Sequence, residues 1–251
     1  MVLIQFLNKL WLQYVVARPT LETHHRKILK EEFPFYNLLN KEQQKLFERK
    51  TRYFMGHKDF VPMKMDVVTD EMKVLISAAA VQLTFGLPFL RLPLFPKILV
   101  FPEKFFNKLT GQYHLGEVSK VGVIALSWKD FKKGINNKNN FKNVGLHELA
   151  HALQFEDAVM NDEHDFLDVK ILKKINLQYL IEKQKLINGE PVYLRKYGLR
   201  NAQEFFAVAI EAFFGQPKQM NHKMPELFHL IAELLHLNPL KLLSKKSFLQ
   251  S

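Results

Sequence analysis

Apolar positions recur along most of the chain at the three- and four-residue spacing of amphipathic helices. Only a few short runs of β-branched and aromatic residues are typical of strands. Helices are predicted over 20–60 with a break near Pro34, 68–85, 143–157, 165–187, 202–214 and, as one helix or two, 225–243. Strands are predicted at 97–101, 113–115 and 121–128, with a polar loop over 129–140. Few strands among many helices indicate an α+β domain.

The first sixteen residues form the most apolar stretch at either end of the chain. They are too short for a confident membrane span, and the sequence after them lacks the small residues of a signal-peptidase site. Their apolar residues follow a helical stripe, so we predict an amphipathic helix over residues 1–19 that docks on the core. The alternatives are a helix on a membrane surface and the remainder of a longer anchor. Residues 20–251 are predicted to form a single domain.

The charge and the cysteine content limit which partners and which metal ligands the chain can have. The formal net charge is +11, but the lysines are scattered and no aromatic-interleaved basic stripe is present, so no nucleic-acid partner is expected. The simplest interpretation of the positive net charge is a solvated surface rich in basic side chains. The chain has no cysteine, which is compatible with a reducing compartment. Any metal ion must therefore be held by imidazole nitrogens and carboxylate oxygens.

One pentapeptide has the residue types and spacing of a metal-binding motif, namely His147-Glu148-Leu149-Ala150-His151. Residues four apart share a helix face, so His147 and His151 can bind one ion together. Glu148 lies at the edge of that face, where its carboxylate can take a proton from metal-activated water. The alternative is a helix with two histidines in ordinary hydrogen bonds. A third ligand is needed to decide between these interpretations.

The segment 202–214 offers two candidates for that ligand. Glu204 and Glu211 are seven residues apart, hence on one face of a helix that is otherwise almost wholly apolar. Carboxylates in such a stretch are costly unless they are paired or bound to metal. The spacing alone allows either glutamate as the ligand. A solvated face that merely carries both is the remaining alternative.

Four blocks of sequence resemble the Mlc titration factor A family of zinc peptidases, whose catalytic domain is similar to that of anthrax lethal factor. These blocks are ILVFPEKF at 98–105, GVIALSWKD at 122–130, NVGLHELAHALQFED at 143–157, and the stretch 197–214. The resemblance runs over roughly residues 25–240 and implies a zincin-like domain, mostly helical, with a small mixed sheet beside the HExxH helix. It also implies that the strand at 123–128 lies at the sheet edge, where it can pair with an extended peptide.

The resemblance implies a role for each site residue in turn. His147 and His151 match the histidine ligands of a Zn²⁺ ion, and Glu204 matches the third ligand of a gluzincin-like site. Glu148 matches the general base. Tyr197 matches a tyrosine that stabilises the oxyanion. Glu211 is then expected behind the ligands, where it orients a histidine or the tyrosine.

Two classes of function follow from these expectations. The first is a zinc metallopeptidase that hydrolyses peptide bonds, with the aminopeptidase-like preference that the family implies. The second is a regulatory protein that binds a transcription regulator, since one family member sequesters a glucose-responsive repressor. A third interpretation, a basic nucleic-acid or membrane-surface protein with a chance HExxH, leaves Glu204 and Glu211 unexplained. A cytoplasmic location is expected, with membrane association through residues 1–16 as the alternative.

Overall fold

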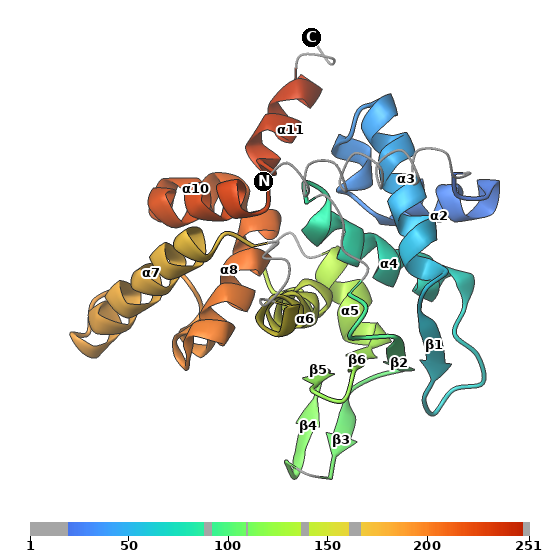
Figure 1. Ribbon diagram of the computed structural model, residues 1–251, viewed down its shortest axis with the longest axis horizontal. Helices are drawn as coiled ribbons and strands as arrows, with labels where there is room; N and C mark the ends of the chain where they lie inside the picture. Colours follow the sequence, from blue (N-terminus) through green and yellow to red (C-terminus); the bar gives the residue numbers. More distant parts are fainter. Residues whose placement is uncertain (1–19, 88–91, 109, 137–140, 161–166, 248–251) are drawn as a thin grey trace. The chain divides into compact units, whose positions relative to one another are not determined.

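The computed structural model describes residues 20–87, 92–108, 110–136, 141–160 and 167–247 (Figure 1). The chain divides into two compact units, Met1–Asn136 and Asn137–Ser251. The helix expected over residues 1–19 lies outside the described residues. The single domain expected over 20–251 stays a prediction, and each unit is described by itself below.

The first unit combines helices with a four-stranded mixed sheet. Its helical elements are α2 (Thr23–Glu32), η1 (Tyr36–Leu38), α3 (Lys41–Met55), α4 (Asp70–Thr84) and α5 (Trp128–Ile135). Its strands are β1 (Asp59–Pro62), β2 (Lys97–Phe101), β3 (Phe105–Asn107), β4 (Gln112–His114), β5 (Gly116–Ser119) and β6 (Val123–Ser127). The sheet has the order β1-β2-β6-β5, in which only β5 runs antiparallel to its neighbour. Strands β3 and β4 pair separately as a hairpin that extends from the sheet (Figure 1). The predicted α+β class is confirmed.

Strand β6 corrects one expectation. The family resemblance implied an edge strand at 123–128, but β6 pairs with β2 on one side and with β5 on the other. Its backbone donors and acceptors are therefore used within the sheet. The edges are β1 and β5. Whether the sheet lies beside the HExxH helix stays a prediction, since the two belong to different units.

Helix α5 corrects a second expectation, the polar loop over 129–140. The side chain of Ser127 accepts a hydrogen bond from the backbone N–H of Asp130 and so caps the helix. Phe131 is fully buried and stacks on Trp128. These two anchors outweigh the polar composition of the segment, which therefore forms a helix as far as Ile135.

Local signals fix the helices of the first unit. Thr69 caps α4 at the backbone N–H of Met72, as predicted. Asn40 and Gln43 form a reciprocal capping box at the start of α3. The Nζ of Lys50, which is buried, donates to the carbonyl oxygens that follow α4. These contacts and a cluster of buried aromatic rings pack α3 against α4.

The second unit is wholly helical over its described residues. Its elements are α6 (Val144–Met160), α7 (Val169–Ile187), η2 (Lys196–Leu199), α8 (Ala202–Gly215), α9 (Pro217–Lys223), α10 (Pro225–Leu234) and α11 (Pro239–Ser247). Helix α8 is buried almost throughout and packs against α6, η2 and α9. It is therefore the central helix of this unit, and its burial explains the nearly unbroken run of apolar residues.

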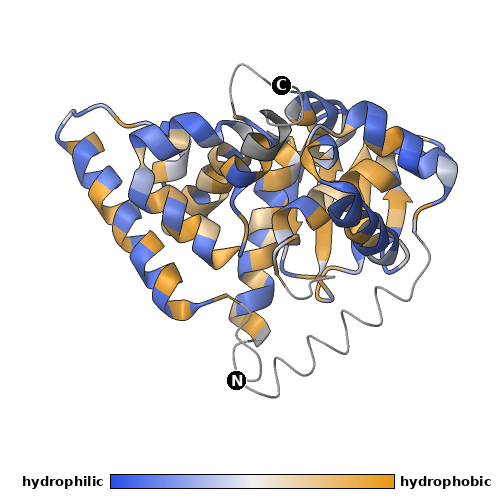
Figure 2. Cartoon of the chain, turned by 90° about the horizontal axis from the view of Figure 1, so that it is seen from above, coloured by the Kyte–Doolittle hydropathy of each residue, from blue (hydrophilic) through white to orange (hydrophobic). Residues whose placement is uncertain are grey.

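Helix α7 is the lysine-rich helix predicted from the sequence. Ile171 and Ile175 lie on its buried face, whereas Leu177, Leu180 and Ile181 are exposed. Figure 2 shows this helix at the left, with hydrophobic and hydrophilic bands in alternation. Among the described helices of the chain, none combines the length and apolar character that crossing a bilayer requires.

Candidate metal centre

Helices α6 and α8 bring three potential ligands together in the second unit. His147 and His151 lie one turn apart on α6, and Glu204 lies in the first turn of α8. Both helix starts are capped by asparagine side chains. Asn143 accepts from the N–H of Leu146, and Asn201 accepts from the N–H of Glu204 at 2.9 Å. The caps fix the first turns, from which His147 and Glu204 project.

The donor atoms of these side chains form a compact triangle. The Nε2 atom of His147 lies 3.1 Å from Oε2 of Glu204 and 3.2 Å from Nε2 of His151. The Nε2 atom of His151 lies 3.5 Å from the same oxygen of Glu204. Two donors that each lie about 2.0–2.1 Å from a tetrahedral zinc ion are roughly 3.3 Å apart. The triangle therefore has the size and the chemistry of three ligands of one such ion.

Glu211 lies behind His147 and sets the orientation of its ring. Its side chain is 1% exposed, and its Oε1 accepts a hydrogen bond from Nδ1 of His147 at 2.7 Å. The same carboxylate accepts from the backbone N–H of Asn143 and from the Nη2 of Arg195. Because Glu211 accepts the proton of Nδ1, Nε2 of His147 faces the triangle and can bind a metal ion once it has lost its own proton.

Electrostatics make the triangle attractive to positive charge. Burial by itself lowers the pKa of His147, but hydrogen bonds to Glu204 and Glu211 outweigh it and raise this pKa to about 9. Burial raises the pKa of Glu204, yet its hydrogen bonds with His147 and His151 prevail and hold it far below its usual value. In the metal-free protein the two carboxylates thus stabilise a proton on His147, in the place where a metal ion would supply the charge.

Glu148 and Tyr197 border the triangle. Glu148 follows His147 directly on α6 and is 8% exposed. Tyr197 lies on η2, and the centroids of its ring and the His147 ring are 5.9 Å apart. The guanidinium of Arg200 lies 4.7 Å from the centroid of the Tyr197 ring. Burial, and after it the charge of Glu204, raise the pKa of the Tyr197 phenol. The phenol therefore keeps its proton at neutral pH and can donate a hydrogen bond.

Glycine is required beside Tyr197 for a packing reason. A Cβ atom at Gly198 would lie 3.0 Å from the Cβ of Val208 on α8, closer than side chains ordinarily approach. The missing side chain lets η2 lie directly against α8. This close packing holds Tyr197 near Glu204, the potential ligand on α8.

The structure thus brings together all six residues that the sequence singled out. It adds Arg195, which no motif marks. The signal that could have found this residue is indirect, since a glutamate in an apolar helix needs a cationic or donor partner. Many lysines and arginines met that condition, so the choice of Arg195 needed the three-dimensional arrangement.

Two histidines and a glutamate that converge next to a second glutamate are an arrangement typical of metal-dependent hydrolases. Residues 8–236 match the family of glucose-regulated metallo-peptidases M90, and the chain belongs to this family. The uncharacterized protein slr2042 of Synechocystis sp. is 28% identical over 92% of this chain and 90% of its own length. The Mlc titration factor A proteins of Edwardsiella ictaluri and Pectobacterium atrosepticum are each 24% identical, over 83% and 81% of this chain and 85% and 82% of their own lengths. The resemblance seen in the sequence is confirmed.

Proposed function

We propose that the protein is a zincin-like peptidase that uses Zn²⁺ to hydrolyse peptide bonds, with an aminopeptidase-like preference. The observation that carries this proposal is the triangle of His147, His151 and Glu204, whose separations of 3.1, 3.2 and 3.5 Å suit one ion. Zinc is preferred because two imidazoles and one carboxylate leave a coordination position open to solvent, the pattern of catalytic zinc sites. Membership of the M90 family supports a metal-dependent hydrolase.

Each side chain around the triangle has a separate role in the proposed reaction. A bound zinc ion would polarise the scissile carbonyl and lower the pKa of water. Glu148 accepts the proton of the attacking water and returns it to the departing amine. The Tyr197 phenol donates a hydrogen bond to the oxyanion that develops on the carbonyl. Glu211 holds the His147 ring in place through its Nδ1–H.

Metal removal tests the proposal most simply. Dialysis against a chelator should abolish hydrolysis of a mixed peptide pool by the purified full chain, and one equivalent of Zn²⁺ should restore it. His151→Ala should remain inactive after the same addition, because it lacks one of the three ligands. Cleavage of free but not N-acetylated peptides, followed by mass spectrometry, tests the aminopeptidase-like preference. Hydrolysis that persists in the chelated protein contradicts the proposal.

Arg195 is proposed to stabilise the buried charge of Glu211. Arg195→Met removes the donor to Glu211 Oε1. Since the arginine side chain is 30% exposed, we expect a loss of about 1–3 kcal/mol in the free energy of unfolding of the metal-free protein. Zinc affinity should fall less than in Glu211→Gln, because Arg195 acts one contact further from the ligands. Denaturant titration of metal-free Arg195→Met beside Arg195→Lys measures the stability, and competition with a chromophoric chelator measures the zinc affinity. Equal stability of Arg195→Met and the unmodified protein refutes the assignment.

A second candidate function is the binding of a transcription regulator. It is supported by the name of the relatives, Mlc titration factor A, at 24% identity over more than four fifths of this chain. A pull-down from cells with Glu148→Gln as bait separates the two functions, since that variant keeps the surface but lacks the proposed base. Stoichiometric capture of one regulator, together with no cleaved peptides in cells that express the active protein, favours binding as the main function.

We also propose a cytoplasmic location, on the absence of cysteine and on the regulator named for the relatives. The alternative, attachment to a membrane surface through residues 1–16, follows from their apolar helical pattern. Sedimentation with anionic vesicles, with and without these residues, distinguishes the two.

A further inference from the structure

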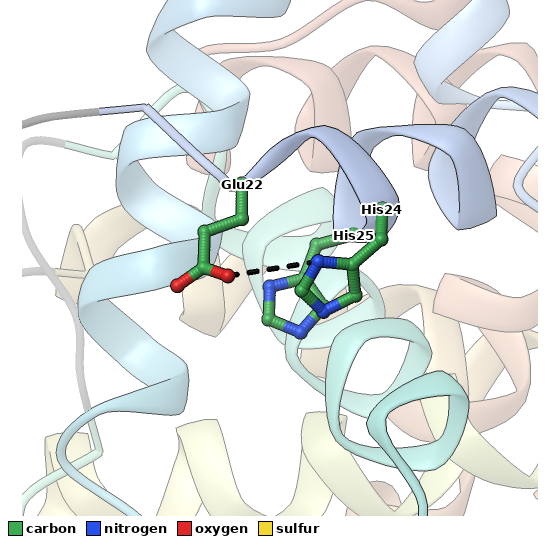
Figure 3. A group of neighbouring side chains, drawn as sticks. All are labelled: Glu22, His24 and His25. Carbon is green, nitrogen blue, oxygen red and sulfur yellow. Dashed lines mark ion pairs between the residues drawn. The ribbon is translucent and has the colours of Figure 1, made fainter.

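A second group of histidine and carboxylate side chains lies in the first unit, at the start of α2. Figure 3 shows Glu22, His24 and His25 gathered there, with the rings of the two histidines side by side. The ring centroids are 3.9 Å apart, and Nδ1 of His24 lies 3.6 Å from Oε2 of Glu22. One potential ligand atom from each of the three residues lies within 4.8 Å of the other two.

Asp70 adds a carboxylate from a different helix. It is the first residue of α4, which packs against α2. Its Oδ2 lies 3.3 Å from Nε2 of His24 and 3.6 Å from Nε2 of His25. Its other oxygen faces Lys73 at 4.0 Å. Glu22 thus faces Nδ1 of the His24 ring and Asp70 faces its Nε2, so Asp70 lies beside the group and is not one of its three potential ligands.

His25 gives independent support for a ligand at this place. The residue is 9% exposed, yet its Nε2 has no hydrogen-bond partner among the described residues. A buried polar nitrogen without a partner is costly, and native structures usually satisfy it.

The group also opens onto space that an ion can enter. Glu22, His25 and Asp70 line a cavity of about 530 Å³. The side chains of Glu22 and His24 are 60% and 55% exposed. An ion at this place can therefore exchange with solvent without any rearrangement of the helices.

We propose that Glu22, His24 and His25 form a second metal site, which binds a divalent transition-metal ion such as Zn²⁺. Mixed imidazole and carboxylate ligands suit Zn²⁺, Ni²⁺ and Cu²⁺, whereas Ca²⁺ and Mg²⁺ prefer oxygen ligands alone. Cationic side chains also line the cavity, so the ion binds more weakly than at His147 and fills this site second. The lining cations are Arg49, Arg52 and Lys73.

Zinc stoichiometry of the full chain tests this site, by equilibrium dialysis against excess Zn²⁺ followed by elemental analysis. The unmodified protein should bind two ions and His24→Ala one. Because His24 is exposed, this variant should fold even if the buried His25→Ala does not. The matched control is His57→Ala, which removes another imidazole lining the same cavity outside the group and should leave two ions bound.

The double variant His24→Ala/His151→Ala separates this site from the proposed catalytic one. If both sites exist, His151→Ala binds one ion and the double variant binds none. If only the second site exists, the unmodified protein and His151→Ala each bind one ion, and His24→Ala binds none. The proposal is overturned if His24→Ala binds as many ions as the unmodified protein, or if His57→Ala loses an ion as His24→Ala does. Either result indicates an adventitious ion only.

Discussion

Glu148→Gln should lower kcat for peptide hydrolysis by about 10²–10⁴-fold, the usual contribution of a positioned general base. The amide that replaces the carboxylate cannot accept a proton from the attacking water. It has nearly the same volume, so the 8% exposed position stays filled and α6 stays folded. Zinc content should remain at the value of the unmodified protein, since Glu148 is not among the three ligands. Steady-state kinetics and elemental analysis on the same preparation measure both quantities.

Glu148→Asp is the matched control for this prediction. It keeps the carboxylate but withdraws it by one methylene, so its kcat should lie between those of Glu148→Gln and the unmodified protein. A loss of zinc from Glu148→Gln would mean that residue 148 supports the ligands rather than the proton transfer. An undiminished kcat in that variant would refute its role as base.

Zinc affinity should fall more in Glu204→Gln than in Glu211→Gln. The first replacement turns a carboxylate into a neutral amide, at the proposed ligand whose Oε2 lies 3.1 Å from Nε2 of His147 and 3.5 Å from Nε2 of His151. The second weakens only the hydrogen bond that orients His147, a change that typically costs 10–100-fold in metal affinity. We therefore expect a loss of about 10–100-fold for Glu211→Gln and more than about 100-fold for Glu204→Gln.

Competition with a chromophoric chelator measures both affinities on one scale. Glu204→Gln leaves the helix cap intact, because Asn201 accepts from the backbone N–H of residue 204 and not from its side chain. Its effect can therefore be assigned to the ligand atom. Full zinc binding by Glu204→Gln together with loss of zinc by Glu211→Gln would exchange the proposed roles of the two glutamates.

Helices with strong local signals could be predicted from the sequence, whereas the pairing of strands could not. Thr69 marks the start of α4, and the prolines around 97–101 bound β2 as expected. The position of β6 inside the sheet depends on β5, a short strand at 116–119 that the sequence analysis did not identify. That strand is recognised only by its partner, because Gly116–Ser119 begins with glycine and has no alternation of buried and exposed positions.

In the candidate site too, the features set by residue spacing could be predicted from the sequence, whereas those set by helix packing could not. The spacing of His147 and His151 defines their shared face from the sequence alone. Glu204 and Glu211 share a face as well, and the sequence could not say which of them approaches Nε2 of His147 and which approaches Nδ1. The packing of α6 on α8 decides this, with Glu204 on the Nε2 side and Glu211 on the Nδ1 side. Arg195 depends on the packing of η2 on α8 and has no local signal.

The central claim is that one ion is bound by side chains of two helices distant in sequence. Anomalous diffraction at the zinc absorption edge, from crystals of the zinc-loaded protein, tests it most directly. We expect a peak about 2.0–2.1 Å from Nε2 of His147, Nε2 of His151 and a carboxylate oxygen of Glu204. A zinc-loaded crystal with no peak among these three side chains would contradict it.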